Sequence, residues 1–288
     1  MSATQAAGTK AATLVEALPY IRSYRNRVVV VKVGGEPIDD PHLATVFAED
    51  VALLSLVGIH VVVVHGGGPQ ISREMRERGV VPEFRDGLRV TGDSAMEVVQ
   101  RILVGDVNAE LVRRLNEAGA AAVGVSGIDG TTIEAARVSC AGGGDLGRVG
   151  EVTTVRTALL TSLLDDGFTP VIAPVGVDPE AATLNVNADV AAAAVASALG
   201  ADKLVYLTNV EGLYRDLGDA TSLVSEMKRD DLAALAPNLS DGMRPKMESA
   251  LAALDGGVAK VHVLDGRVEH ALLLEIFTPD GVGTQVLP

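Results

Sequence analysis

The stretch that decides the fold is Val61-Val62-Val63-Val64-His65-Gly66-Gly67-Gly68-Pro69-Gln70. Its four valines predict a strand buried on both faces, because β-branched side chains suit a covered, pleated surface. The three glycines allow a sharp turn and a close approach by a ligand, and the proline suits the first turn of a helix. A helix N-terminus offers unpaired N–H groups and partial positive charge, so the pattern favours an anion-binding site. A tight turn without a ligand is the alternative.

The same pattern occurs earlier in the chain. Residues 28–33 read Val-Val-Val-Val-Lys-Val and run into Gly34-Gly35, with Lys32 near the end of the apolar run. A helical pattern over 41–57 follows, then the strand at 59–65 and a helix over 69–78. This β-α-β-α alternation predicts a three-layer αβα sandwich around a mainly parallel sheet.

Two segments are expected to leave the sheet as antiparallel excursions. The first spans 80–92, where Asp86-Gly87 indicates a hairpin with Arg89 on its return arm, and the second spans 131–155 around the glycines at 142–144. Between and beyond them we expect helices at 93–104, 106–118, 156–165, 190–199, 243–254 and 270–275, and strands at 120–125, 168–173, 203–208, 260–263 and 284–287. No linker separates these elements, so residues 26–288 are expected to form one domain, with lobes at about 26–178 and 179–288.

The first segment, residues 1–25, stands outside this alternation. Leu14, Val15, Leu18 and Ile21 fall on one face of a helix over 12–25, and Pro19 is expected to kink it. An amphipathic helix must bury its apolar stripe, either on its own domain or on another subunit. The residues leave both alternatives open.

Composition narrows the class of protein. The 288 residues are 48% hydrophobic and 22% charged, which is typical of a globular chain. A net charge of −14 and 3% aromatic residues argue against nucleic acid or an anionic membrane as partner, and no apolar run approaches the length of a membrane span. The single cysteine, Cys140, cannot form an internal disulfide and fits a cytoplasmic location.

Several kinds of active site are excluded by their missing motifs. The sequence has no G-x-x-x-x-G-K-[ST] loop, no G-x-G-x-x-G after the early strands, and no clustered metal ligands. His65-Gly66-Gly67-Gly68 is like the oxyanion loop of esterases, but Ser126 lacks the spacing of their nucleophile elbow. No metal site is therefore expected.

The remaining polar residues suit phosphoryl transfer. Two lysines, Lys32 and Lys246, can neutralise charge on a transferred group, and Asp189 between them would hold both. Lys246 falls in the first turn of a helix, where a cation is disfavoured unless an anion is bound nearby. Asn187 is expected to cap the helix that follows it, and Arg89 can pair with a substrate carboxylate.

Five ordered motifs resemble those of the N-acetylglutamate kinases of the amino acid kinase superfamily. They are Lys32-Val33-Gly34-Gly35, His65 to Gln70, Gly87-Leu88-Arg89-Val90-Thr91, Asn185-Val186-Asn187-Ala188-Asp189, and Asp241-Gly242-Met243-Arg244-Pro245-Lys246. The resemblance runs from about residue 12 to the C-terminus. It implies phosphorylation of the γ-carboxylate of N-acetyl-L-glutamate by ATP, with Mg²⁺ carried by the nucleotide phosphates, in arginine biosynthesis.

The resemblance also implies roles for individual residues. Lys32, Lys246 and Asp189 match the catalytic positions, and the acetylglutamate-binding positions are matched by Gly67, Gly68, Arg89 and Asn185. Gly34, Gly35 and Gly66 match the loops that hold phosphate. An ionised carboxylate nucleophile needs no general base, and the motifs offer none.

The first segment resembles the extra N-terminal helix of arginine-sensitive members. The resemblance implies that this helix interlaces dimers into a hexamer, and that L-arginine inhibits at a site with Tyr20, Lys203, Glu275 and Gly281. Two departures from the family pattern are Val33 and Glu36, and we expect Glu36 to point away from the phosphates. The alternatives are a kinase for glutamate, aspartate or carbamate, or a regulatory subunit without turnover.

Overall fold

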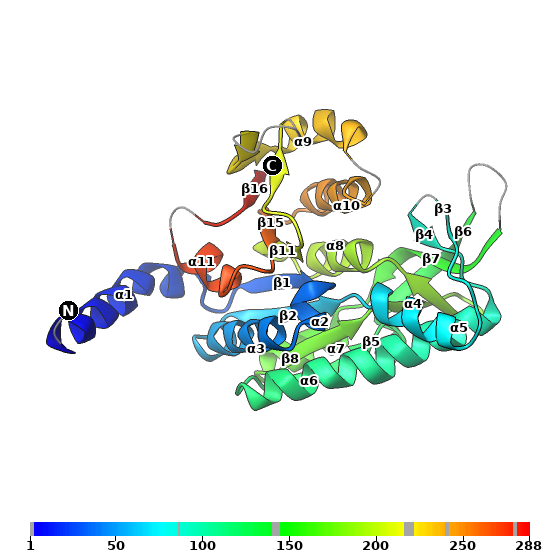
Figure 1. Cartoon of the computed structure of the whole chain (residues 1–288), viewed down its shortest axis with the longest axis horizontal. Coiled ribbons are helices and arrows are strands. Elements are labelled where there is room, and N and C mark those ends of the chain that lie inside the picture. Colours follow the sequence, from blue (N-terminus) through cyan, green and yellow to red (C-terminus); the bar gives the residue numbers. More distant parts are fainter. Residues whose placement is uncertain (1–2, 86, 140–144, 216–221, 240–241, 279–280) are drawn as a thin grey trace.

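The computed structural model describes residues 3–85, 87–139, 145–215, 222–239, 242–278 and 281–288. An eight-stranded sheet crosses the middle of the molecule (Figure 1). Its order is β14 (Glu226–Lys228), β16 (Thr284–Leu287), β15 (Val261–Asp265), β11 (Lys203–Thr208), β1 (Val28–Val33), β2 (His60–His65), β8 (Thr169–Ala173) and β5 (Ala122–Ser126). Every neighbouring pair is parallel except β15 and β16, which confirms the mainly parallel sheet.

The two valine-rich strands lie side by side at the centre of this sheet. β1 and β2 pair in parallel with Val30 opposite Val62, and Val29, Val31 and Val63 are fully buried. Both faces of the sheet are therefore covered, as the unbroken valine runs predict.

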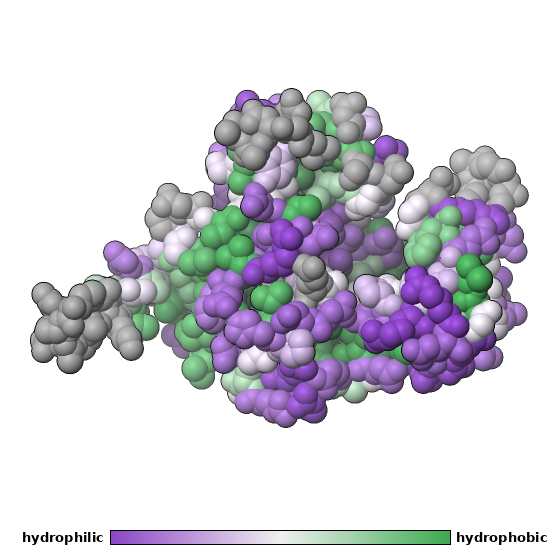
Figure 2. Space-filling model, viewed as in Figure 1, coloured by the Kyte–Doolittle hydropathy of each residue, from purple (hydrophilic) through white to green (hydrophobic). Residues whose placement is uncertain are grey.

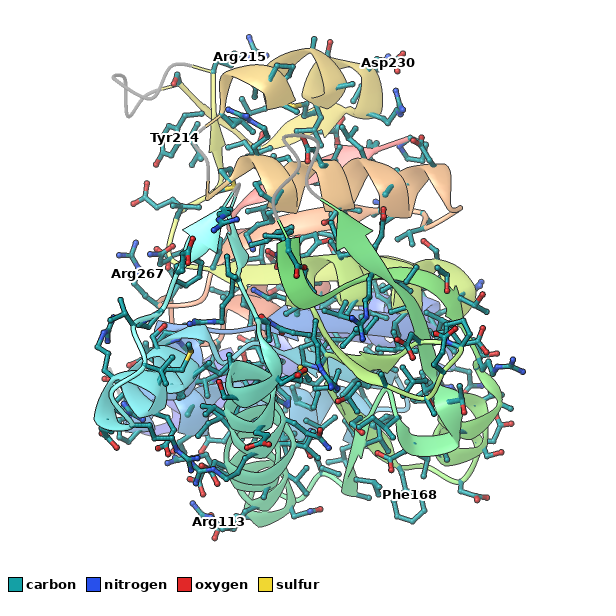
Figure 3. All side chains as sticks on the ribbon, turned by 90° about the vertical axis from the view of Figure 1, so that its right-hand side faces the viewer. Arg113, Phe168, Tyr214, Arg215, Asp230 and Arg267 are labelled. Atoms are coloured by element: carbon teal, nitrogen blue, oxygen red, sulfur yellow. The ribbon has the colours of Figure 1, made fainter. Side chains whose placement is uncertain are left out.

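Helices from distant parts of the chain cover the sheet. One face packs against α7 (Ala158–Asp165), α8 (Ala188–Ala198) and α10 (Arg244–Asp255). The other packs against α3 (Pro41–Leu56), α6 (Asn108–Glu117) and α11 (Ala271–Phe277). The three-layer αβα sandwich is confirmed. Figure 3 shows the molecule from the side, with Arg113 of α6 at one end and Asp230 of α9 (Arg229–Leu235) at the other.

Both antiparallel excursions form as expected. β3 (Phe84–Arg85) and β4 (Leu88–Arg89) make the first hairpin, and Asp86 at its turn lies outside the described residues. The second joins a small four-stranded barrel of β6 (Ile133–Ser139), β7 (Asp145–Val155), β9 (Val175–Val177) and β10 (Thr183–Val186). Its tip, residues 140–144 with Cys140, is likewise outside the described part.

The expected break between helices 93–104 and 106–118 was wrong. α5 (Asp93–Gln100), a π-helical segment (Arg101–Val107) and α6 run on without interruption. Gly105 costs about 1 kcal/mol in a helix, which is too little to end one whose neighbours Ile102, Leu103 and Val107 are buried in the core. Packing therefore overrides the local preference.

The remaining elements are short and mostly border the ends of the strands. Among the described residues they are α2 (Glu36–Asp39), α4 (Gly68–Glu77), β12 (Leu213–Tyr214), β13 (Leu223–Val224) and two short 3₁₀ turns (Asp129–Thr131 and Ala236–Asn238). The sequence patterns did not predict α2, α9 or five of the strands: β9, β10, β12, β13 and β14.

The N-terminal helix α1 (Ala3–Tyr24) projects from one end of the molecule (Figure 1). It begins earlier than expected and continues through Pro19. Leu14, Val15 and Leu18 are 71%, 63% and 43% exposed and Ile21 is partly buried, so this chain leaves most of the apolar stripe uncovered. Figure 2 shows hydrophobic, green surface on the side from which α1 projects. Across the described residues, every helix is too short or too polar to cross a membrane.

Candidate active site

The two glycine-ended strands bring their turns into contact. The Gly66 N–H donates to the Val33 carbonyl at 2.8 Å, and a Cβ on Gly34 would lie 3.5 Å from the Gly66 Cα. α4 begins at Gly68 without a side-chain cap, with Pro69 in its first turn. A Cβ on Gly67 would come within 2.6 Å of the Leu103 Cδ2, so the main chain fits tightly there. The uncapped N–H groups of α4 thus lie at the edge of the sheet, as the opening stretch predicts.

Asp189 joins the two candidate catalytic lysines. Its Oδ1 lies 2.9 Å from the Lys32 Nζ, and both carboxylate oxygens accept from the Lys246 Nζ at 2.9 Å. Lys32 comes from β1, Asp189 from the first turn of α8, and Lys246 from the first turn of α10. Asn187 caps α8 by accepting the N–H groups of Asp189 and Val190, which confirms its expected role. Three distant segments therefore converge on one carboxylate.

The Lys32–Asp189–Lys246 cluster has a net charge of +1, and its three side chains are largely shielded from bulk water. Burial opposes the negative charge of Asp189, but the two ammonium groups outweigh burial and hold the pKa of the carboxyl at about 2. Burial lowers the pKa of Lys246 to about 8, against the attraction of Asp189 and with the repulsion of Lys32. The cluster thus holds an excess of positive charge that an anion would stabilise.

A pocket of about 230 Å³ opens beside this cluster. Its lining includes two predicted catalytic residues, one predicted phosphate-loop glycine and all four predicted substrate positions: Lys32 and Asp189, Gly66, and Gly67, Gly68, Arg89 and Asn185. Lys246 is not in this lining but is bonded to Asp189, which is; Gly34 and Gly35, directly after β1, are not in the lining either. Gly35 has φ +72° and begins the turn into α2, and the side chain of Glu36 is outside the described part.

Arg89 is held by the protein at the wall of this pocket. Its side chain donates to the Gly68 carbonyl at 3.0 Å and to the Ser72 Oγ at 2.7 Å, and it lies 4.6 Å from the Phe84 ring centroid. Burial lowers the pKa of its guanidinium, with the neighbouring Arg76 adding to the effect. A buried guanidinium beside an open pocket is suited to an anionic group.

Sequence reasoning missed two residues of the site. Tyr206 of β11 is fully buried, and its ring centroid lies 5.1 Å from the Lys246 Nζ. His65 is also fully buried. Its Nδ1 lies 2.9 Å from the Gly66 carbonyl and its Nε2 lies 3.1 Å from the Asn108 Nδ2. Burial lowers the pKa of His65 to about 4, so the ring is neutral and fixes the glycine turn. A tyrosine within an apolar strand and a histidine at its end were the available signals.

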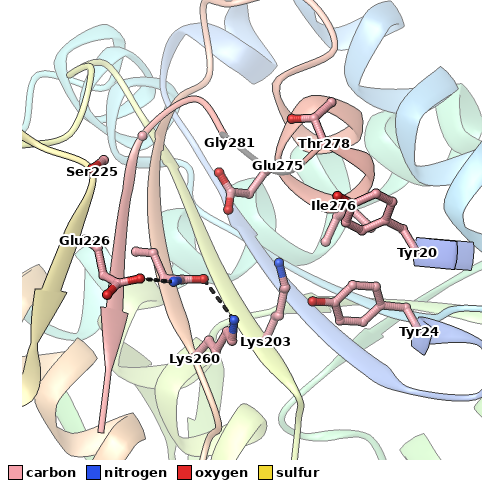
Figure 4. Close-up of a pocket in the computed structure, with 12 residues that line it drawn as sticks. Tyr20, Tyr24, Lys203, Ser225, Glu226, Lys260, Glu275, Ile276, Thr278 and Gly281 are labelled. Atoms are coloured by element: carbon pink, nitrogen blue, oxygen red, sulfur yellow. Dashed lines mark hydrogen bonds between the residues drawn. The ribbon is translucent and has the colours of Figure 1, made fainter. Parts of the chain in front are cut away.

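A second pocket, of about 350 Å³, brings together the four residues expected at an arginine site (Figure 4). Tyr20 comes from α1, Lys203 from β11, Glu275 from α11, and Gly281 from the loop before β16. Glu275 projects into the space that Lys203 and Tyr20 border. Burial lowers the pKa of Lys203 to about 8, although Glu275 favours its charge.

Further residues of this second pocket were not expected. Tyr24 places its ring 5.0 Å from the Lys203 Nζ, and Lys260, Gln285 and Glu226 form a hydrogen-bonded chain along one wall. Behind the pocket, the His262 Nδ1 lies 2.6 Å from the Glu275 Oε1. Spacing alone could not group these residues, because they come from four segments of the chain.

Among the described residues, no three His, Cys, Asp or Glu side chains cluster as ligands. Both oxygens of Asp189 face ammonium groups, which leaves the first pocket with cationic and amide donors.

Comparison with known proteins agrees with this geometry. Residues 27–265 match the model of the amino acid kinase family. The N-acetylglutamate synthase of Neisseria gonorrhoeae, solved with coenzyme A and N-acetyl-glutamate, superposes with a TM-score of 0.87 at 31% identity, over 96% of this chain and 63% of that longer one. The carbamate kinase of Giardia lamblia shares the fold at a TM-score of 0.66 and 14% identity, over 91% of this chain and 98% of that one.

Curated relatives match nearly the whole chain. The acetylglutamate kinase of Acidothermus cellulolyticus is 53% identical and that of Streptomyces coelicolor 47% identical, each over 97% of this chain and over 97% and 92% of their own. The chain therefore belongs to the amino acid kinase family and, within it, to the acetylglutamate kinases.

Proposed function

We propose that the chain transfers the γ-phosphoryl group of ATP to the γ-carboxylate of N-acetyl-L-glutamate, forming N-acetylglutamyl 5-phosphate for arginine biosynthesis. The observation that carries this proposal is the Asp189 carboxylate held between two ammonium groups at the edge of the pocket. In-line transfer between two anions needs positive charge at both ends of the transferred group. Lys32 borders the pocket and serves the substrate side, and Lys246 serves the nucleotide side.

Substrate recognition is assigned to the first pocket. Arg89 would pair with a carboxylate of acetylglutamate. Asn185 donates to the Thr91 Oγ1 at 3.1 Å, which fixes its amide beside the pocket for the substrate. Gly67 and Gly68 would present main-chain N–H groups, with Gly34, Gly35 and Gly66 forming the phosphate loops. The γ-carboxylate is ionised at neutral pH and attacks without a general base.

The two lobes divide these tasks. Residues 26–178 would bind the amino acid and residues 179–288 the nucleotide, with residues 1–25 serving assembly. Mg²⁺ would arrive on the nucleotide phosphates, because the pocket offers them cations and main-chain donors rather than a cage of carboxylates. We place this chemistry in the cytoplasm.

L-arginine is the proposed inhibitor, bound in the second pocket. Its carboxylate suits Lys203, and its two cationic groups suit Glu275 and Glu226. Tyr20 would make this site depend on α1. The exposed stripe of α1 supports assembly of dimers into a hexamer through this helix.

A direct assay tests the catalytic proposal. The protein is incubated with MgATP and N-acetyl-L-glutamate, and the acylphosphate is trapped with hydroxylamine. Glutamate, aspartate and carbamate are tested in parallel, because other amino acid kinases act on such acids. Turnover of acetylglutamate alone supports the proposal, whereas preference for another acid, or no turnover, contradicts it. Added L-arginine tests inhibition in the same assay.

A further inference from the structure

Tyr206 of β11 lies next to all three members of the Lys32–Asp189–Lys246 cluster. In the parallel pair of β1 and β11 it lies directly opposite Lys32, so the two side chains share one face of the sheet. Its hydroxyl donates to the Asp189 main-chain carbonyl at 3.3 Å, and its ring lies 5.1 Å from the Lys246 Nζ. One residue thus pairs through its strand with β1 and reaches α8 and α10 with its side chain.

We propose that the Tyr206 ring is a positioning residue for the reaction, holding the Lys246 ammonium by a cation–π contact while Asp189 is shared with Lys32. This inference rests on the proposed roles of those three residues in phosphoryl transfer. The ring face attracts a cation within about 6 Å, and the attraction is strongest where water is excluded. Tyr206 is fully buried and Lys246 nearly so, which meets that condition.

A neutral ring suits this position better than a second carboxylate. Another anion beside Lys246 would repel the phosphates that the ammonium must meet, whereas a ring attracts the cation without adding a net charge. Burial, together with the charge of Asp189, raises the pKa of the Tyr206 hydroxyl well above its ordinary value, so the ring stays neutral. The hydroxyl anchors the start of α8 while the ring faces α10.

The contact also favours the charged form of Lys246. Burial pulls the pKa of this lysine down to about 8, and Lys32 repels its charge from β1 while Asp189 attracts it from α8. A ring that attracts cations less strongly stabilises the charged form of Lys246 less, so the pKa of this lysine should fall further. The alkaline limb of the kcat/KM profile for ATP is then expected to move toward lower pH.

A fluorinated series separates this effect from simple packing. Phenylalanine, 3,5-difluorophenylalanine and pentafluorophenylalanine are placed at position 206, because they keep the ring's shape while weakening its attraction for cations. We expect kcat to fall stepwise along the series, to about one tenth of the phenylalanine value in the pentafluoro variant. The KM for acetylglutamate stays within threefold, and the alkaline limb shifts to lower pH in the same order.

Equal kcat and an unmoved alkaline limb across the series overturn the inference. Tyr206→Leu gives a second readout. We expect its kcat to fall about as far as that of the pentafluoro variant, and its thermal midpoint checks that the protein is folded. Lys246→Ala is measured in the same assay. If Lys246→Ala turns over normally, the proposed site fails. If it loses activity while the fluorinated series is flat, only the role of the ring fails.

Discussion

Lys203 and Tyr206 lie three residues apart on β11, one in the pocket beside α1 and the other against Lys246. This separation is about 10 Å along an extended strand. β11 is paired on both sides, with β1 and β15, and cannot bend freely between the two residues. The pocket at Lys203 and the ring that faces Lys246 are therefore joined by one strand that is held on both sides.

Removing either lysine should abolish most of the turnover. Lys32→Ala or Lys246→Ala removes a preorganised positive charge from the transferred group, and we expect kcat to fall at least ~100-fold. Steady-state kinetics with both substrates saturating measures this loss. Lys228→Ala removes an exposed lysine of β14 and is the matched control. Near-normal turnover in both active-site variants would refute the assignment.

Activity should decline above pH 8. The pKa of Lys246 is lowered to about 8, so its ammonium is charged below that pH and is lost as pH rises. The alkaline limb of kcat/KM for ATP reports the free enzyme and should lie near pH 8. Bound phosphates favour the ammonium, so the limb of kcat should lie at higher pH. A kcat/KM that stays flat to pH 10 would contradict this expectation.

Arg89→Lys should weaken binding of the amino acid more than it slows the chemical step. Lysine keeps the charge but loses the planar fork that contacts Gly68 and Ser72 beside the pocket. We expect the KM for acetylglutamate to rise about tenfold or more, with a smaller change in the KM for ATP. Arg85→Lys, on the exposed strand of the same hairpin, is the control. An equal rise in both variants would argue for a general effect on the hairpin.

The exposed stripe of α1 should control assembly and regulation. Leu18→Glu places a charge on a side chain that this chain leaves 43% exposed, so the isolated fold is expected to remain intact. We expect light scattering to show dimers in place of hexamers, and arginine inhibition to weaken. Deleting residues 1–25 should abolish both the hexamer and the inhibition by arginine. Val81→Glu makes the same change at an 85% exposed site away from α1. A hexamer that persists without residues 1–25 would exclude α1 as the link.

The central strands, their glycine turns and the cap of α8 could be predicted from the sequence, because each depends on residues that are neighbours in the chain. The valine runs of β1 and β2, the glycines after them and the capping Asn187 each depend on neighbours in sequence, and each was found where expected. The break at Gly105 failed because tertiary packing, invisible in a local pattern, decided that helix.

The site itself was only partly predictable. Motif order and charge identified Lys32, Asp189 and Lys246, but the sharing of one carboxylate depends on three elements meeting in space. The pattern of β11 predicts Tyr206 as a strand residue but not its contact with Lys246, because spacing within a strand does not show which distant side chain a ring faces. The pocket around Lys203 combines α1 with the end of the chain, and no local pattern brings those parts together.

Because the Lys32–Asp189–Lys246 cluster has excess positive charge, the free-energy cost of bringing its like charges together arises on folding and not during the reaction. Cations that are already oriented and dehydrated need no reorganisation when negative charge moves during the reaction. Folding, rather than each catalytic cycle, brings these like charges together. The ligand-free enzyme therefore keeps repelling charges close together, which lowers its free energy of unfolding. Binding of a polyanion such as a nucleotide offsets this repulsion, and should raise the free energy of unfolding by more than binding of an uncharged ligand would.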